Sequence, residues 1–371
     1  MLPPHPIPQE QGTEWIAKIC SFLADHGDKP KSAARIERLI RRYAVKPAQI
    51  ASRRFECPDV GRLNWADNQV FDVERWKQSG QTSGDLTTKM RFFLDRAEQI
   101  FERFYGSKAA PDHIIHVTCT GYGSPSAAQV LVDRRGWHEL TDISHAYHMG
   151  CYASVPAVRS AAALVALERL GRDTPEYRVD VAHTEMCGLH FNPSENGPEP
   201  TIIHTLFADG HIKYSLVPPG RASSGYQVLA LAERIVPGTS RQMTWMPESW
   251  GFRMGLGRQV PQLIAEHIKP FCRALLRDAG IDSEREWPEI TFAIHPGGPS
   301  IINSIQHVLE LSEAQVEQSK AVLMERGNMS SATLPHIWKR IQDQGLPAGK
   351  TVLSLAFGPG LSIFGAVFRI I

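Results

Sequence analysis

The segment that follows Cys151 has almost no polar side, and this feature most constrains how the chain can fold. From Ala153 to Ala166 the residues are apolar with few exceptions, and a charged pair comes only at Glu168-Arg169. A helix that is apolar on nearly all sides is a buried one. Gly171 then suits a left-handed cap at its end. The sequence therefore predicts a buried helix in the middle of the chain, directly after a cysteine.

Short β-rich runs alternate with helical runs around this helix, which is typical of a parallel sheet crossed by helices. Before it we expect peripheral helices at 14–25, 32–44 and 85–105, then strands at 113–118 and 142–144. After it we expect a strand at 177–182, and then a hairpin of strands at 201–207 and 212–217. The hairpin turn is predicted at Ala208-Asp209-Gly210-His211.

The same order of elements starts again near Tyr226. Alternation predicts a strand to Val236, and the following segments predict a helix at 259–278, a strand at 289–294, helices at 301–311, 312–326 and 334–344, and two closing strands. Because strand and helix recur in both parts, we expect an internally duplicated α/β fold. Its halves are predicted at residues 1–225, which carry Cys151, and 226–371.

The composition excludes several classes of protein. The 371 residues carry a net charge of +1, with 42% hydrophobic and 21% charged residues, as in an ordinary globular protein. No nucleic-acid partner follows from this balance. The six cysteines form no CxxC pair and no cluster with histidine at zinc spacing, so we expect reduced thiols and no metal site.

Neither end of the chain predicts a membrane or export signal. The N-terminus lacks the basic and apolar regions of a signal peptide, so a cytoplasmic protein is expected. Residues 351–371 are apolar and about long enough to span a bilayer. However, Phe357-Gly358-Pro359-Gly360 interrupts them, which favours two buried strands joined by a tight turn and no membrane partner.

Cys151 is the first candidate for chemistry. The run His148-Met149-Gly150-Cys151 places its thiol after a short strand and a glycine turn, at the predicted first residue of the buried helix. Free main-chain N–H groups and the helix dipole favour a thiolate there. Structural cysteines also occupy helix starts, so position alone leaves both interpretations open.

Two further motifs have the same ambiguity when taken alone. His295 lies at a strand end before Pro296-Gly297-Gly298-Pro299, where a catalytic base or oxyanion donor tends to sit, or where a histidine merely caps a turn. Asn328 follows a helix that ends at Gly327, and this pattern by itself is only a helix end followed by a new cap.

Together, in the order Cys, His and Asn, these motifs resemble the type III polyketide synthases, the chalcone synthase group of the thiolase superfamily. The resemblance covers about residues 117–371. It rests on six segments: Gly150-Cys151, Leu206-Phe207-Ala208-Asp209-Gly210, Gly251-Phe252-Arg253-Met254, His295-Pro296-Gly297-Gly298-Pro299, Gly327-Asn328-Met329-Ser330-Ser331 and Phe357-Gly358-Pro359-Gly360. It implies a homodimeric thiolase fold with five αβαβα layers.

The resemblance also implies roles for single residues. Cys151 would be the acyl-carrying nucleophile, His295 and Asn328 the decarboxylation and oxyanion pair, and Phe207 the gate between tunnel and cavity. The turn Gly358-Pro359-Gly360 would shape the floor near the nucleophile. The cavity wall would be formed by Cys119, Thr120, Glu185, Cys187, His190, Trp245, Met254 and Ser330. Met254 stands where plant members carry an aromatic ring, which suggests room for an aliphatic chain.

The implied chemistry suits these residue types. A thiolate attacks a thioester and later leaves, and pairing with protonated His295 would keep Cys151 ionised. Decarboxylation of a malonyl unit leaves an enolate oxygen that two donors, His295 and Asn328, would stabilise. The expected reaction is decarboxylative Claisen condensation of acyl thioesters without a cofactor. Whether the product then cyclises to a pyrone or resorcinol stays open at this point.

Departures from the family pattern bear on the substrate. The usual FGDGA segment ends here in His211, and Tyr147-His148-Met149 replaces the glutamine pair common in plant members. The basic residues that bind CoA phosphate in plant enzymes cannot be matched one by one, so acyl-CoA and acyl carrier protein both remain open as donors. The alternatives are a stand-alone ketosynthase that makes one condensation or joins two carrier-bound chains, and a non-catalytic protein that only binds acyl chains.

Overall fold

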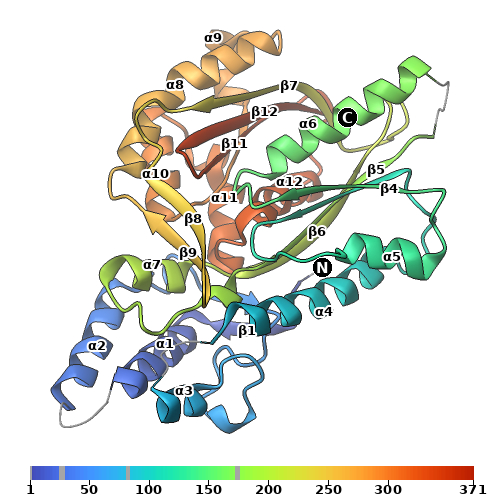
Figure 1. The fold of residues 1–371 in the computed structure, drawn as a ribbon. Coiled ribbons are helices and arrows are strands. Elements are labelled where there is room, and N and C mark those ends of the chain that lie inside the picture. The colour runs from blue at the N-terminus through green and yellow to red at the C-terminus, as the bar shows by residue number, and fades with distance from the viewer. Residues whose placement is uncertain (1, 25–29, 81–83, 172–175) are drawn as a thin grey trace.

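The computed structural model describes residues 2–24, 30–80, 84–171 and 176–371. Two four-stranded sheets form its framework (Figure 1). The first has the order β4 (Asp142–Tyr147), β3 (His113–Thr118), β5 (Val179–Met186), β6 (Asp209–Leu216). The second has the order β10 (Thr291–Ile294), β11 (Thr351–Gly358), β12 (Ser362–Ile370), β7 (Tyr226–Ile235).

Three strands of each sheet share one arrangement, whereas the fourth strands lie at opposite edges, β4 beside β3 and β7 beside β12. In the first, β3 pairs in parallel with β5, and β5 pairs antiparallel with β6. In the second, β10 pairs in parallel with β11, and β11 pairs antiparallel with β12. A helix precedes the middle strand in each: α6 (Ser154–Gly171) before β5, and α12 (Thr333–Asp343) before β11. This repeat of strand, helix, strand and antiparallel strand is the duplication that the sequence predicts.

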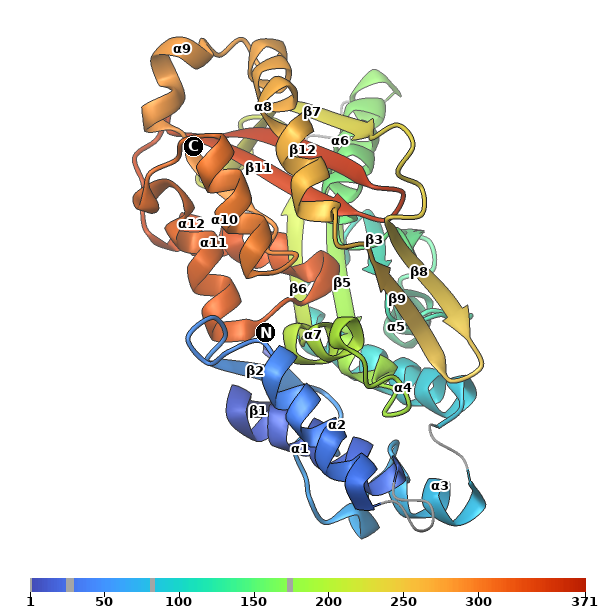
Figure 2. The same cartoon turned by 90° about the vertical axis from the view of Figure 1, so that its left-hand side faces the viewer.

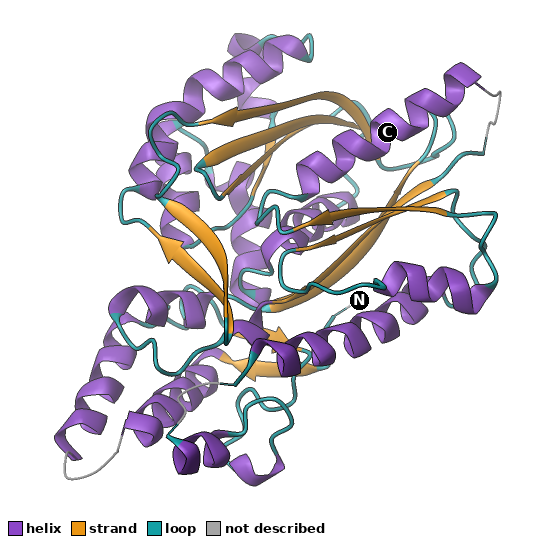
Figure 3. Ribbon diagram, in the orientation of Figure 1, coloured by secondary structure: helices purple, strands orange, loops and turns teal. Residues whose placement is uncertain are grey.

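Helices α6 and α12 lie between the two sheets. Strands of both sheets contact α6, and α12 contacts β10 and β6 (Figure 3). The predicted burial of α6 holds for its first half, where Val155, Ala157 and Ala161 are buried. In the second half Val165 is still buried, but the prediction is wrong at Leu167, which is 62% exposed. Apolar composition alone does not show where a helix runs past the sheets that cover it.

The remaining helices cover the outer faces. On the first sheet lie α4 (Leu86–Tyr105) and α5 (Ala127–Arg135), and on the second lie α8 (Val260–Asp278), α10 (Pro299–Val308) and α11 (Glu313–Arg326). The order of layers is therefore helices, sheet, helices, sheet, helices. Among the described residues, no helix combines the length and apolarity needed to cross a membrane. Residues 351–370 instead form the antiparallel pair β11–β12, as predicted.

The N-terminal elements form one end of the molecule (Figure 2). They are β1 (His5–Pro8), α1 (Gln9–Ala24), α2 (Pro30–Tyr43), β2 (Ser52–Phe55) and α3 (Val73–Ser79), where β1 and β2 pair antiparallel. The prediction that the N-terminal helices are peripheral is wrong for α1, because Trp15, Ile16 and Ile19 are buried in a hydrophobic core. The short segments 65–67, 187–190, 283–286, 287–289 and 330–332 are single helical turns.

One predicted strand is a helix. Residues 201–207 belong mostly to α7 (Pro198–Leu206), which packs against α1 and α2, and the antiparallel partner of β6 is β5. The β-branched residues Thr201, Ile202 and Ile203 favoured a strand. However, Pro198 at the first turn starts a helix, and Thr201 and Thr205, four residues apart, form its buried face. The sequence also gave no signal for the hairpin β8 (Met243–Glu248) and β9 (Gly251–Leu256).

Candidate active site

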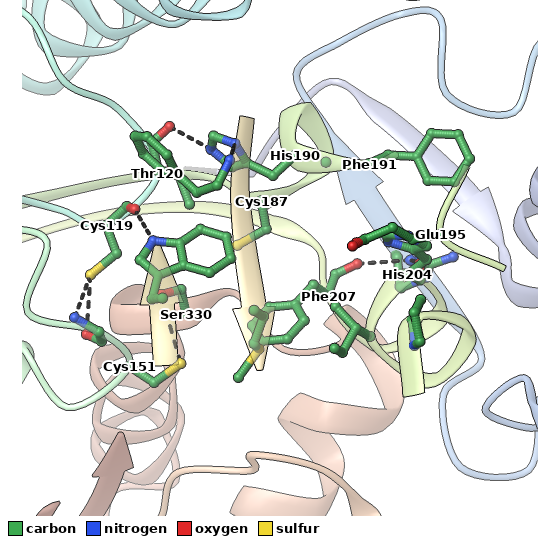
Figure 4. A pocket seen from close by; sticks show the side chains of 18 of the residues that line it. Cys119, Thr120, Cys151, Cys187, His190, Phe191, Glu195, His204, Phe207 and Ser330 are labelled. Carbon is green, nitrogen blue, oxygen red and sulfur yellow. Dashed lines mark hydrogen bonds between the residues drawn. The ribbon is translucent and has the colours of Figure 1, made fainter. Parts of the chain in front are cut away.

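A cavity of about 960 Å³, part of it open to solvent, lies between the first sheet, the N-terminal elements and the β8–β9 hairpin. Ten of the residues predicted from the sequence line it: Cys119, Thr120, Cys151, Cys187, His190, Phe207, Trp245, Met254, Ser330 and Pro359. Figure 4 shows Cys151 and Cys119 at one side of it, Glu195, His204 and Phe191 at the other, and Phe207 between. Concave sites with a largely apolar lining and a few polar groups are common ligand sites.

Cys151 lies on a tight turn between β4 and α6. The turn requires positive φ angles at His148 (58°) and Gly150 (90°), and α6 begins at Ser154, three residues later than predicted. The Gly150 N–H donates to Sγ of Cys119 over 2.9 Å, which fixes the turn to the end of β3. The Cys151 thiol is 3.8 Å from the Ser330 hydroxyl. Burial raises the pKa of Cys151 to about 12.

The turn Gly358-Pro359-Gly360 packs directly against this loop. A Cβ atom on Gly150 would lie 2.4 Å from Cδ of Pro359, so glycine is required for the close approach. Beside it, the Tyr152 ring stacks on Phe364 with centroids 4.1 Å apart. Pro359 lines the cavity, whereas Gly358 and Gly360 are not among its lining residues and act only through the shape of the turn.

Asn328 lies in the turn that leads to α12, so its position relative to α12 matches that of Cys151 relative to α6. Its Oδ1 accepts a hydrogen bond from the Ser330 N–H over 2.9 Å. Its Nδ2 is buried and has no hydrogen-bond partner among the described residues. Asn328 and Ser330 thus belong to one turn that touches the Cys151 thiol.

His295 follows β10, and its main-chain N–H donates to the Leu355 carbonyl over 2.8 Å. Both ring nitrogens are buried and lack partners among the described residues. Burial lowers the pKa of His295 to about 3. Burial thus favours the neutral form of both groups and opposes the ion pair of Cys151 and His295 that the sequence predicts.

Glu185 was predicted in the cavity wall but lies behind it. It is fully buried and accepts hydrogen bonds from the Cys119 N–H over 3.0 Å, from the Thr120 hydroxyl over 2.8 Å and from the Ser331 hydroxyl. Burial raises its pKa. The carboxyl group therefore holds the ends of β3 and of the Asn328 turn together. His295, Asn328 and Glu185 are not among the lining residues of the cavity.

An aromatic wall completes the cavity. The ring of His190 stacks on Phe252 at 4.5 Å, donates from Nε2 to the Thr120 carbonyl over 2.8 Å and accepts from the Phe252 N–H at Nδ1. Because one ring nitrogen donates and the other accepts, His190 is neutral, and burial lowers its pKa to about 3. Trp245 donates from Nε1 to the Cys119 carbonyl over 2.7 Å.

The main chain of Phe207 is held by the N-terminal segment, a contact that the sequence did not predict. Arg53 donates from Nη1 to the carbonyls of His204 and Phe207 over 2.8 and 2.7 Å. Phe207 also forms a one-residue parallel bridge with Asn328. Arg53 is one of several basic residues in the N-terminal part of the sequence, and nothing in the sequence indicates that its guanidinium is the buried one. Trp15, Ile16 and Val60 also line the cavity, but they belong to no recognisable motif.

Comparisons with known proteins agree with this geometry. Residues 227–371 match the family model of chalcone and stilbene synthases, C-terminal domain. A probable polyketide synthase 1 of Dictyostelium discoideum is 30% identical over 99% of this chain and 11% of that protein. Type III polyketide synthase A of Arabidopsis thaliana is 29% identical over 69% of this chain and 65% of that protein.

A solved structure covers the whole fold. The C-terminal type III polyketide synthase domain of Steely1 from Dictyostelium superimposes with a TM-score of 0.81 at 25% identity, over 99% of this chain and 96% of that one. The five layers therefore define a thiolase fold, as the sequence predicts. The chain belongs to the type III polyketide synthase family.

Proposed function

We propose that the protein catalyses decarboxylative Claisen condensation of acyl thioesters, with the growing chain carried on Cys151. The observation that supports this most is the set of buried nitrogen atoms on His295 and Asn328 that have no hydrogen-bond partner among the described residues. Buried polar groups are nearly always hydrogen-bonded, so unpaired ones at a candidate site mark positions for a substrate. The turn that carries Asn328 also contacts the Cys151 thiol.

The first step loads the enzyme. The Cys151 thiol attacks the carbonyl of an acyl thioester, and the new C–S bond replaces the bond to the leaving thiol. Because burial keeps Cys151 protonated, its proton must leave during the attack. We assign His295 as the base, since it is neutral and both its ring nitrogens lack partners. The proton then passes to the departing thiolate, and charges balance.

The second step forms the carbon–carbon bond. A malonyl thioester loses CO₂, and the electron pair of the broken bond moves into an enolate whose oxygen faces the N–H groups of His295 and Asn328. The enolate carbon attacks the acyl carbonyl on Cys151, and the thiolate leaves. The relatives named above are polyketide synthases, which favours repeated condensation with closure to a pyrone or resorcinol over a single-step ketosynthase.

The finer features belong to the same proposal. Acyl-CoA or acyl carrier protein would deliver the substrates, and no cofactor would be required. Each chain would consist of two thiolase-like halves, residues 1–225 and 226–371, and two chains would form a homodimer. The cavity beyond Phe207 is lined by Trp15, Ile16, Val60 and Ile203, and this apolar surface supports an aliphatic starter. Mass spectrometry of products from CoA-bound and carrier-bound donors would separate the two modes of delivery.

The deciding experiment is covalent labelling with a radiolabelled acyl thioester. Wild-type protein is expected to retain the label, and Cys151→Ala is expected to lose it. Cys187→Ala is the matched control, because this thiol also lines the cavity but has no proposed chemical role. Persistent labelling of Cys151→Ala would rule out the assigned nucleophile. If the wild-type protein does not decarboxylate a malonyl thioester, the result would favour a protein that only binds acyl chains.

A further inference from the structure

His148 lies in the turn that carries Cys151, and the proposed reaction gives it no role. It is one of three described non-glycine residues with a positive φ angle. Another of the three is Ser330, whose hydroxyl is 3.8 Å from the Cys151 thiol. Such conformations are strained for a residue with a side chain, and they persist where surrounding contacts fix them. The contacts that hold His148 are therefore informative about its role.

The side chain of His148 is bonded to the β8–β9 hairpin. Its Nε2 lies 3.0 Å from the Trp245 carbonyl. Because a carbonyl can only accept, this nitrogen carries a proton and donates it. The same ring meets Phe252 of β9 edge to face, with centroids 5.2 Å apart. The main-chain N–H of His148 donates to the Thr118 carbonyl at the end of β3 over 2.9 Å. One half-buried residue thus connects the nucleophile turn, β3 and the hairpin.

The hairpin forms a wall of the cavity and lies apart from both four-stranded sheets (Figure 2). Among the described strands, β8 and β9 pair only with each other. The base of β8 is held at Met243, whose carbonyl accepts from the Gly360 N–H over 3.2 Å. The turn after β8 is held at Ser249, whose carbonyl accepts from the Leu86 N–H over 2.9 Å. Both ends of β8 are therefore fixed by main-chain hydrogen bonds.

The middle of β8 is held towards the thiol by two hydrogen bonds at Trp245. One is donated by His148, and the other is donated by Trp245 Nε1 to the Cys119 carbonyl over 2.7 Å. Cys119 in turn accepts at Sγ from the Gly150 N–H, next to the nucleophile. Trp245 lines the cavity, so the distance of this wall from Cys151 depends on both bonds.

Strand β9 is fastened to a different part of the cavity rim. Three contacts join it to residues 190–199: the Phe252 N–H donates to His190 over 2.9 Å, Arg253 pairs with Glu195 at 2.8 Å, and the Leu256 N–H donates to Glu199 over 2.7 Å. None of these contacts involves the nucleophile turn. Loss of the bond from His148 would therefore leave the hairpin attached and free only its middle, at Trp245.

We propose that His148 is a positioning residue that sets the distance between the Trp245 wall and the Cys151 thiol, and thereby limits the number of condensations. This inference rests on the proposed function, because the growing chain must be attached to Cys151. Each condensation lengthens that chain, and the space beside the thiol limits how far it can grow before it meets the wall. Without the bond from His148, the middle of the hairpin can move away from the thiol, and longer chains fit.

The test counts the malonyl units in the products made from octanoyl-CoA and malonyl-CoA, by mass spectrometry. His148→Leu removes the donor, and the ratio of longer to shorter products is expected to rise about 2- to 10-fold, the factor that corresponds to one net hydrogen bond. His148→Gln is the rescue variant, because its amide nitrogen lies the same number of bonds from Cβ as Nε2 and also donates. It is expected to restore the wild-type ratio.

A purely structural role of His148 would give less active protein and lower every product by the same factor. Active sites are therefore counted by acyl labelling of Cys151, and product ratios are compared per labelled site. His267→Leu is the matched control, because His267 is also half-buried and donates to a main-chain carbonyl, that of Leu263 over 2.9 Å, but lies on α8 and does not line the cavity. It should keep the wild-type ratio.

An unchanged product ratio in His148→Leu would overturn the proposal. So would a glutamine variant that behaves like the leucine variant, or a control that shifts the ratio equally. Absence of both labelling and condensation in the wild-type protein would instead reject the proposed function, so the two failures are distinguishable.

Discussion

The close contact between Gly150 and Pro359 makes the position of Cys151 sensitive to a single methyl group. In Gly150→Ala, the added Cβ would lie 2.4 Å from Cδ and 3.0 Å from Cγ of Pro359. Ordinary carbon contacts are about 3.5–4.0 Å, so the clash is about 1 Å too short. The proline ring is rigid, and the loop that carries Cys151 must therefore shift.

Both stability and activity should respond to this shift. A non-glycine residue at a φ of 90° costs about 1–2 kcal/mol, and overpacking adds about 1–3 kcal/mol. The free energy of unfolding should therefore fall by about 2–5 kcal/mol. Displacement of the nucleophile by about 1 Å is expected to lower kcat for condensation about 100-fold.

Gly136 provides a control for the free-energy cost of the positive φ angle alone. It has a φ of 65°, and a Cβ there would meet nothing within 4 Å. Gly136→Ala should therefore cost about 1–2 kcal/mol and leave kcat unchanged. Urea denaturation and the rate of product formation measure the two quantities. Equal stability and equal activity of the two variants would refute the role assigned to the Gly150–Pro359 contact.

Three further predictions concern the groups of the site and its surroundings. Asn328→Ala should lower malonyl decarboxylation about 10²–10³-fold by loss of one oxyanion donor, while acyl labelling of Cys151 persists; an unchanged decarboxylation rate would exclude that role. Replacement of Arg53 by Lys should weaken the hold on the Phe207 carbonyl and reduce kcat more than it raises KM, whereas loss of stability alone would indicate a structural role only. Burial lowers the pKa of Lys89 to about 7 from its usual 10.5, so the unfolded chain binds an extra proton between these values and stability rises with pH across that window. The stability advantage of Lys89→Met over wild type should therefore be largest near pH 7, on the order of a few kcal/mol, and shrink towards pH 10.5; a difference independent of pH would contradict this.

Local sequence patterns predicted most of the framework. The strand at 113–118 coincides with β3, and the helix at 259–278 differs from α8 by one residue. Such elements have a clear period or clear punctuation, so their local preference agrees with their final environment. The closing strands were recognised because Phe357-Gly358-Pro359-Gly360 can only form a turn there.

The wrong predictions concern residues whose structure depends on contacts with distant parts of the chain. The β-branched run at 201–203 became part of α7, because α1 and α2 bury one face of it as a helix. Glu185 was assigned to the cavity wall, but its hydrogen bonds to Cys119 and Thr120 place it behind these residues. For α7, Pro198 was a local signal for a helix start, but the β-branched run favoured a strand. The position of Glu185 depends on contacts with distant segments, so no local signal could report it.

The sequence by itself determined that Cys151, His295 and Asn328 are the candidate reactive groups, since motif and order carry that information. It also determined the duplicated α/β fold. Only the tertiary structure decided that burial raises the pKa of Cys151 and lowers that of His295, because desolvation depends on atoms brought together from distant segments. For the same reason, only the fold could bring Trp15 of α1 and His204 of α7 into ring contact with Phe191.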